Sequence, residues 1–127
     1  MKIITKSILS LGLAMFLMTN LSATEKKIYD EKQDSKIDTV QFEVKGVCNM
    51  CKERIENAAL IKGVKWVEWN KITDTLTVIF RKDKTKLMDI HKSIAEAGHT
   101  TELVECNLDS YHKLPACCAY MGDVKKH

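Results

Sequence analysis

Two cysteines separated by two residues, Cys48 and Cys51, are the residues of this sequence best suited to chemistry. They stand where an expected strand ends and an expected helix begins, and the unpaired N–H groups of a helix N-terminus favour a thiolate over a thiol. Lys52 and Arg54 add positive charge nearby. Thiolates select Cu(I), Zn(II) and other soft or borderline metals, so the pair predicts a soft-metal site. Two ligands leave an ion under-coordinated, which suits a carrier that exchanges its metal.

Three further cysteines, Cys106, Cys117 and Cys118, stand near the end of the sequence. Two interpretations of them remain open. In the first, the tail folds back and Cys117 and Cys118 complete or cap the metal site, with His112 as a further candidate. In the second, Cys106 forms a disulfide with one of the adjacent pair. A strand over 100–105 would carry Cys106 on the order of 20 Å from the first pair at ~3.3 Å per residue, so Cys106 is not expected at that site.

The elements that must position these cysteines follow from the spacing of apolar residues. Alternation predicts half-buried strands, and apolar residues three and four apart predict helices. The expected strands cover 39–45, 64–69, 75–81 and 100–105, and the expected helices cover 50–61 and 87–97. The spacing of Val64, Val67 and Trp69 implies a bulge or a change of face in the second strand. This order predicts an α+β fold, the ferredoxin-like βαββαβ sandwich with two helices on a four-stranded antiparallel sheet.

His99 is a candidate for the same site because of this topology. In a βαββαβ domain, the loop after the first strand and the loop after the second helix share one end. His99 lies in the second of these loops, directly after Gly98. It is therefore a candidate third ligand or a modulator of the metal site, and a solvated loop histidine is the alternative.

Residues 39–105 resemble the heavy-metal-associated domain, on the strength of the element order combined with the C-x-x-C motif. That family includes small copper chaperones, the metal-binding domains of copper-exporting ATPases and a periplasmic mercury-binding protein. Its loop usually reads G-M-x-C-x-x-C. Here Cys48 and Cys51 match, whereas Gly46 stands at the usual Met position. Met50 is expected to fill the lost volume by packing, a weak thioether contact being the alternative.

The N-terminal residues predict export. Lys2 and Lys6 precede an apolar run, Ile8–Met18, that is too short to span a bilayer, so residues 1–23 are interpreted as a signal peptide. An uncleaved N-terminal anchor is the alternative. The charged segment 24–38 is expected to be a flexible linker, followed by the heavy-metal-associated domain over 39–105 and a cysteine-containing tail over 106–127. The mature protein is therefore expected in the periplasm or outside the cell.

Charge and motifs exclude other classes of function. Removal of residues 1–23 takes away two lysines and no acids, so the formal charge falls from +3 to +1. This balance, without a basic block, argues against nucleic acid as a partner. The sequence has no Ser-His-Asp pattern, phosphate loop or carboxylate pair in a catalytic setting, so a binding protein is expected in place of an enzyme.

The leading function is an extracytoplasmic metal carrier or scavenger that acts by thiolate exchange. Cu(I) is the favoured ion, and Zn(II) and Hg(II) also suit the ligands. The expected partner is a metal-transporting membrane protein or another thiolate-bearing acceptor. The alternative from the enzyme class is a thiol–disulfide oxidoreductase with Cys48 as nucleophile and Cys51 as resolving thiol. A third interpretation is a ferredoxin-like interaction domain whose cysteines are incidental.

Overall fold

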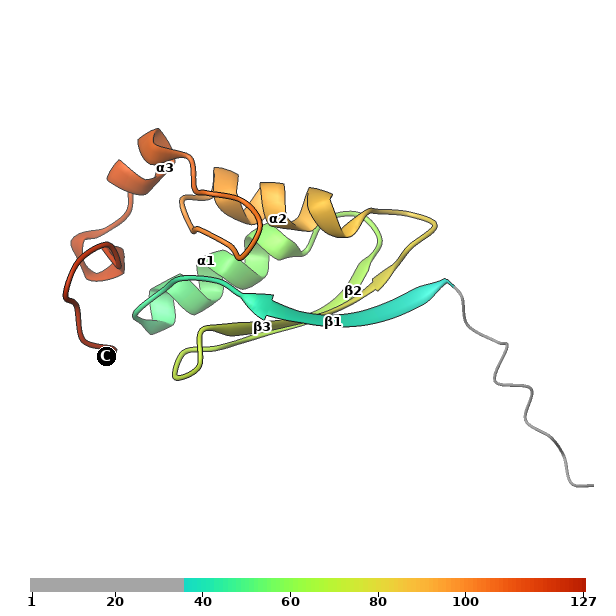
Figure 1. Ribbon diagram of the computed structural model, residues 1–127, viewed down its shortest axis with the longest axis horizontal. Coiled ribbons are helices and arrows are strands. Elements are labelled where there is room, and N and C mark those ends of the chain that lie inside the picture. The colour runs from blue at the N-terminus through green and yellow to red at the C-terminus, as the bar shows by residue number, and fades with distance from the viewer. Residues whose placement is uncertain (1–35) are drawn as a thin grey trace, which may run out of the picture. The chain divides into compact units, whose positions relative to one another are not determined.

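The computed structural model describes residues 36–127 (Figure 1). The predicted signal peptide and most of the predicted linker lie outside the described residues. Within residues 36–127, no helix is long and apolar enough to cross a membrane. The elements, in chain order, are β1 (Ile37–Glu43), α1 (Asn49–Ala59), β2 (Val64–Asn70), β3 (Thr75–Arg81), α2 (Leu87–Glu96), α3 (Leu108–His112) and the 3-10 turn η1 (Ala116–Cys118).

The three strands form one antiparallel sheet in the order β1-β3-β2. β3 shows the expected alternation most clearly, because Leu76, Val78 and Phe80 are buried while their neighbours are only partly covered. The bulge predicted in β2 is confirmed by a register shift between Val64 and Trp66. Both long helices lie on the same side of this sheet (Figure 1). The α+β, ferredoxin-like arrangement is thus present in β1 through α2.

Each long helix buries the face that the apolar spacing predicts. In α1 this face consists of Cys51, Ile55 and Ala59, and α2 contributes Ile90 and Ile94. Full burial of a large aliphatic side chain such as isoleucine stabilises the fold by about 1.5–3 kcal/mol. The two helices are also linked directly, since the Ser93 hydroxyl donates to the carbonyl oxygen of Ala58 at 2.6 Å.

The fourth strand expected over 100–105 is not confirmed. Only a single β-bridge, between Val44 and Thr101, remains of it. The chain then turns back, and the N–H of Thr101 donates to the carbonyl oxygen of Val104 at 2.9 Å. The Thr101 hydroxyl also accepts from the N–H of Val104 at 3.0 Å. Such side-chain bonds to nearby backbone groups compete with strand pairing. Adjacent apolar residues, Leu103 and Val104, also break the alternation that a strand needs.

This turn sends the tail towards the end of the domain where α1 begins. The N–H of Asn107 donates to the carbonyl oxygen of Ala95 at 2.9 Å, and the Asn107 side chain caps α3 by accepting from the N–H of Ser110 at 3.1 Å. η1 then packs beside α1, as Figure 1 shows for the last, red part of the ribbon. The tail predicted as a separate segment is therefore part of the folded domain.

Candidate metal centre

Three thiols from two distant parts of the sequence meet at the start of α1. The Sγ atom of Cys48 lies 3.4 Å from Sγ of Cys51 and 3.5 Å from Sγ of Cys118. All three side chains are buried, with exposed fractions of 4%, 0% and 0% respectively. We call Cys48, Cys51 and Cys118 the inner thiols. The tail thus folds back onto the first cysteine pair, the geometry that the first of the two interpretations requires.

Cys117 extends this group towards solvent. Its Sγ atom and those of Cys48 and Cys118 all lie within 4.8 Å of one another, a grouping that can hold a metal ion. Cys117 is only partly buried, and its thiol donates to the Sδ atom of Met50 at 3.5 Å. Met50 is 47% exposed, so it does not fill the core, and the expectation that it packs there is wrong. The thioether contact is what the structure contains.

The volume left by Gly46 is taken by Trp69. A Cβ atom added to Gly46 would stand 2.8 Å from two carbon atoms of the Trp69 ring, Cζ2 and Cη2, and 3.1 Å from the Cβ atom of Cys51. The ring is 1% exposed and is fixed by its Nε1–H, which donates to the carbonyl oxygen of Val44 at 2.9 Å. Glycine is therefore required here by the close approach of an anchored indole ring.

The environment lowers the pKa of one inner thiol and raises the others. Burial opposes ionisation of Cys48, but the backbone N–H of Cys51, the thiols of Cys51 and Cys118, and the N–H of Met50 outweigh it and lower the pKa of Cys48 to about 7. Burial raises the pKa of Cys51. Burial, reinforced by the neighbouring thiols, also raises the pKa of Cys118. Cys48 is therefore the inner thiol that ionises most readily near neutral pH.

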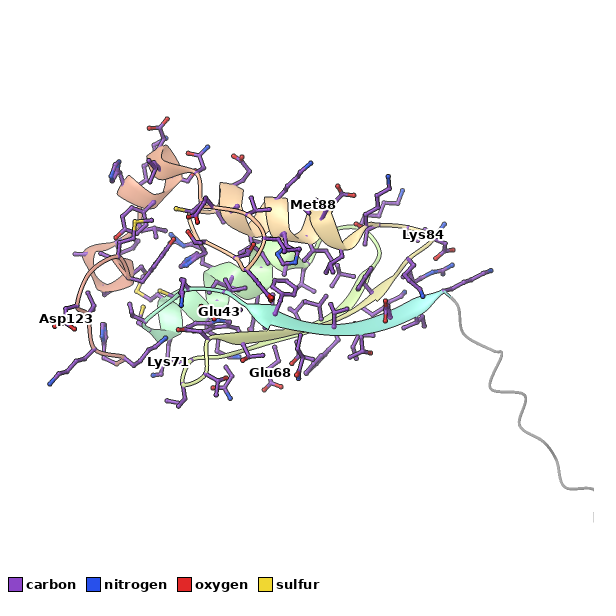
Figure 2. The ribbon with its side chains drawn as sticks, in the orientation of Figure 1. Glu43, Glu68, Lys71, Lys84, Met88 and Asp123 are labelled. Carbon is purple, nitrogen blue, oxygen red and sulfur yellow. The ribbon has the colours of Figure 1, made fainter. Side chains whose placement is uncertain are left out.

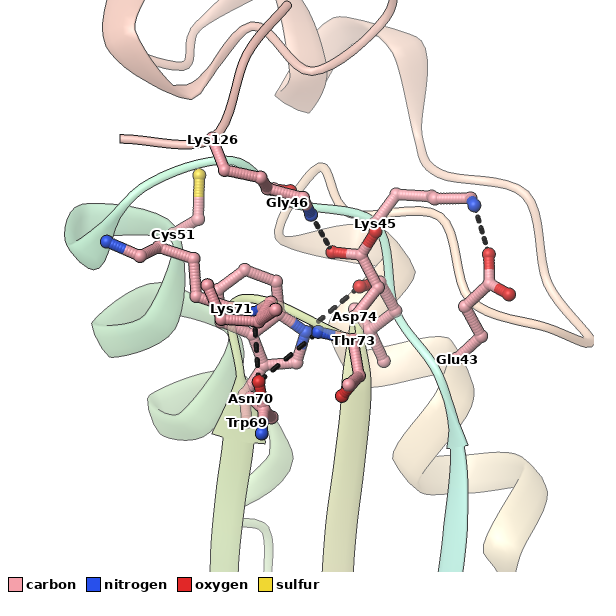
Figure 3. A network of polar contacts seen from close by, with 12 residues as sticks. Glu43, Lys45, Gly46, Cys51, Trp69, Asn70, Lys71, Thr73, Asp74 and Lys126 are labelled. Carbon is pink, nitrogen blue, oxygen red and sulfur yellow. Dashed lines mark hydrogen bonds and ion pairs between the residues drawn. The ribbon is translucent and has the colours of Figure 1, made fainter.

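The last residues of the sequence also contact the loop that precedes Cys48 (Figure 3). The Nζ atom of Lys126 donates to the carbonyl oxygen of Gly46 at 2.6 Å and forms an ion pair with Asp74. This ammonium group also lies 5.6 Å from the centre of the Trp69 ring. In addition, the N–H of His127 donates to the carbonyl oxygen of Val47 at 2.9 Å. Two backbone carbonyls that precede the C-x-x-C motif are thus held by the tail.

Tyr120 anchors the tail beside the inner thiols. Its hydroxyl donates to the carbonyl oxygen of Gly98 at 2.8 Å and accepts from the N–H of Thr100 at 2.9 Å. Its ring stacks on His99 with the centroids 5.4 Å apart. Because Tyr120 follows Cys118 by two residues, these contacts hold the tail thiol against Cys48.

His99 lies at this end of the domain, as the topology predicted, but outside the cluster of sulfur atoms. Its side chain is fully buried, so the alternative of a solvated histidine is wrong. Nδ1 lies 2.8 Å from the carbonyl oxygen of Lys45, which can only accept, so Nδ1 carries the proton and Nε2 a lone pair. Burial lowers the pKa of His99 and keeps the ring neutral. Among the described residues, Nε2 has no hydrogen-bond partner.

Two other candidates lie elsewhere. His112 is exposed on α3, where its ring meets the edge of Tyr111, and it does not belong to the sulfur group.

Cys106 is a buried free thiol beside the Tyr120 hydroxyl, so the structure does not contain a disulfide between Cys106 and the tail pair. Its N–H donates to Thr100 Oγ1 at 3.2 Å, which shows that the chain has returned from the turn. The distance between Cys106 and the Cys48–Cys51 pair that a fourth strand would have produced therefore does not apply.

Two separations between the inner sulfur atoms can be compared with those around a bound ion. At a metal–sulfur distance of about 2.3 Å, the sulfur atoms around an ion lie about 4.6 Å apart in linear, about 4.0 Å in trigonal and about 3.8 Å in tetrahedral coordination. The observed separations of 3.4 and 3.5 Å need only a small expansion for trigonal or tetrahedral coordination. A linear site would require the Cys48–Cys51 pair to open by about 1 Å or more.

Comparisons with known proteins bear on the fold of this chain. A scan against protein-family models and a search of curated proteins found no match. Among solved structures, a putative copper-ion-binding protein from Bacillus anthracis str. Ames is similar over 54% of this chain and 100% of its own, with 22% identity and a TM-score of 0.51. This likeness supports the ferredoxin-like fold.

Two further solved structures cover a similar share of the chain. The CopZ metallochaperone covers 50% of this chain and 98% of its own, with 23% identity and a TM-score of 0.49. Oxidized MerP from Ralstonia metallidurans CH34 covers 52% of this chain and 94% of its own, with 28% identity and a TM-score of 0.49. About half of this chain lies outside each similarity.

Sequence reasoning missed the residues that hold the site together. Trp69 was expected only as a strand residue, and the glycine at the usual Met position was the signal that a larger side chain from elsewhere must fill the loop. Tyr120 and Lys126 gave no signal of their own, because their partners are backbone carbonyls that only the turn at 101–104 brings within reach.

Proposed function

We propose that this protein binds one soft metal ion through Cys48, Cys51 and Cys118 and carries it to a thiolate-bearing acceptor. The observation that supports this function is the contact of the Cys48 sulfur with two other buried thiols, one of them from the tail. In the apo protein two of these thiols are protonated, and they release their protons when the ion binds. The protein acts as a carrier or scavenger and catalyses no reaction.

Cu(I) is the ion that this ligand set favours. Three thiolates provide the soft, trigonal environment that suits Cu(I), whereas structural Zn(II) sites need four ligands in a tetrahedron. Cys117 offers a fourth thiolate, so Zn(II) and Hg(II) are the competing ions. The likeness to the copper-ion-binding protein concerns the fold, so the metal preference rests on the ligands.

His99 is proposed as a positioning residue for the loop. Its Nδ1–H holds the carbonyl oxygen of Lys45, three residues before Cys48, and its ring supports Tyr120. A residue that orients a ligand in this way usually changes metal affinity when it is replaced. His99→Ala is expected to weaken Cu(I) binding without changing the number of ions bound.

The experiment that tests this function is a Cu(I) titration of the reduced protein against a chromophoric Cu(I) chelator. One ion per chain is expected, and Cys48→Ser/Cys51→Ser is expected to abolish binding. Cys106→Ser is the matched control, since this buried thiol contacts Tyr120 instead of the cluster. X-ray absorption at the copper edge should show about three sulfur neighbours at about 2.3 Å. Absence of tight binding to the reduced wild type would refute the function.

A thiol–disulfide oxidoreductase remains the second candidate, because Cys48 combines a pKa of about 7 with a neighbouring thiol at 3.4 Å. A thiolate of this kind attacks disulfides. Reduction of insulin disulfides by the metal-free protein would support it. The burial of all three inner thiols argues for the metal carrier, since an exchange catalyst must present its nucleophile to a protein substrate.

We propose further that the protein acts outside the cytoplasm, on the basis of the apolar run within residues 1–23. The acceptor would be a metal-transporting membrane protein or another protein with exposed thiolates. N-terminal sequencing of the protein recovered from the periplasmic or secreted fraction tests both export and the cleavage position, expected after Ala23.

A further inference from the structure

Among residues 36–127, the side chains around the inner thiols cover them almost completely. Cys51 and Cys118 are fully buried, and Cys48 is 4% exposed. A donor or acceptor protein transfers a soft metal by ligand exchange, in which its own thiolate must touch the ion before the old bonds break. The metal must therefore reach a position with accessible sulfur atoms.

Such a position lies directly beside the cluster. The thiol of Cys117 and the thioether of Met50 are 3.5 Å apart, and both side chains are at least partly exposed. Met50 belongs to the first turn of α1, whereas Cys117 comes from η1, so the two sulfur atoms meet only because the tail folds back. The Cys117 sulfur also lies within 4.8 Å of the sulfur atoms of Cys48 and Cys118.

We propose that Met50 and Cys117, the outer sulfur pair, form a transfer site through which Cu(I) enters and leaves the inner thiols. This inference rests on the proposed function and adds the route and its selectivity. Under the proposed function the inner thiols hold the resting ion, so Met50 and Cys117 act only during its transfer.

The transfer proceeds by ligand exchange without a change in oxidation state. On entry, Cu(I) forms bonds to Met50 Sδ and Cys117 Sγ as bonds to the donor's thiolate ligands break, and the Cys117 thiol releases its proton to water. Bonds from the ion to the inner thiols then form as the bonds to Met50 and Cys117 break. The two protonated inner thiols lose their protons in this step; the Cys117 thiolate takes up one of them and the other passes to water. Release to an acceptor is the reverse, with the acceptor's thiolate in the donor's place.

The chemistry of the outer pair selects for Cu(I). A thioether is a soft, neutral ligand that binds Cu(I), whereas Zn(II) takes its protein ligands from cysteine, histidine and carboxylates. A Zn(II) ion gains nothing from Met50, so its exchange should not depend on that side chain. The effect of replacing Met50 on metal exchange can therefore be compared between Cu(I) and Zn(II) in the same variant.

The test measures the rate of metal transfer from the loaded protein to a chelator, together with the equilibrium affinity. Met50→Leu removes the sulfur atom and keeps the apolar volume. It is expected to slow Cu(I) transfer about tenfold, the usual scale for loss of a supporting metal contact, while the affinity stays within about twofold. Zn(II) transfer is expected to be unchanged. Cys117→Ser should also slow Cu(I) transfer.

The matched control is Met88→Leu, a second half-exposed methionine that lies on α2 (Figure 2). This variant should transfer Cu(I) at the wild-type rate. A Met50→Leu protein with a wild-type Cu(I) transfer rate, or one equally slow with Zn(II), would overturn the transfer site and leave the proposed function intact. A wild-type protein without Cu(I) affinity would overturn both.

Discussion

Gly46→Ala is the substitution whose effect follows most directly from the geometry of the metal loop. The added methyl group would stand 2.8 Å from two carbon atoms of the Trp69 ring. The ring cannot retreat easily, because it is buried and its N–H bonds to Val44. Overpacking of this kind costs about 1–3 kcal/mol, so the free energy of unfolding is expected to fall by that amount.

A double-mutant cycle with Trp69→Phe isolates this contact. A phenyl ring does not reach the positions of Cζ2 and Cη2, so the methyl group added at position 46 would find space in the double variant. The two substitutions should therefore be coupled by about 1 kcal/mol or more, with Gly46→Ala costing less in the Trp69→Phe background. Urea unfolding of the reduced, metal-free protein measures all four free energies.

The control for the cycle is Trp66→Phe, since Trp66 is 44% exposed on the same strand. It should leave the cost of Gly46→Ala unchanged. Gly46→Ala should also weaken Cu(I) binding by about tenfold, because the methyl group presses on the Cβ atom of Cys51 at 3.1 Å. A Gly46→Ala protein as stable as the wild type, or additive costs in the cycle, would refute this account of the loop.

Three further predictions concern the thiols and the residue that closes the tail over them. Cys118→Ser should lower Cu(I) affinity roughly 10- to 100-fold, as measured by chelator competition. Tyr120→Phe removes a hydroxyl that serves two backbone groups, at a cost of about 1–2 kcal/mol, so alkylation of Cys118 should accelerate about tenfold; Tyr111→Phe, whose hydroxyl accepts one exposed N–H, is the control. The pKa of Cys48 lies below its ordinary value, so its ultraviolet thiolate absorbance should appear as the pH rises through about 7 and be lost below it, and Cys48→Ala should remove this step.

The sequence predicts the part of the site that local structure creates. C-x-x-C at a strand-to-helix junction predicts two sulfur atoms at the N-terminus of α1, and Cys48 indeed occupies the N-cap position of that helix. The alternation in β3 and the spacing in α1 and α2 predict the sheet and both helices. These features depend on residues close together in the chain, which is why periodicity finds them.

The rest of the site depends on where the chain goes after α2. Residues 100–105 contain Leu103 and Val104 on adjacent positions, and the Thr101 hydroxyl takes the N–H of Val104, so a turn forms where a strand was expected. A strand would have carried the tail away from the C-x-x-C loop. Whether Cys117 and Cys118 reach that loop is therefore decided by a local competition between two hydrogen-bonding patterns, which apolar spacing does not reveal.

The same turn explains why the tail covers the inner thiols. Cys118 is fully buried, and Tyr120 and Lys126 bond to carbonyl oxygens of Gly98 and Gly46 on either side of the inner thiols. A two-thiolate loop without this cover would expose its thiolates to oxidants, to which low-pKa, accessible cysteines are the most susceptible. Closure protects the thiolates but also blocks direct ligand exchange. Under the proposed function, a protein that both shields and delivers a metal needs a sulfur position outside the cover, and Cys117 beside Met50 meets that requirement.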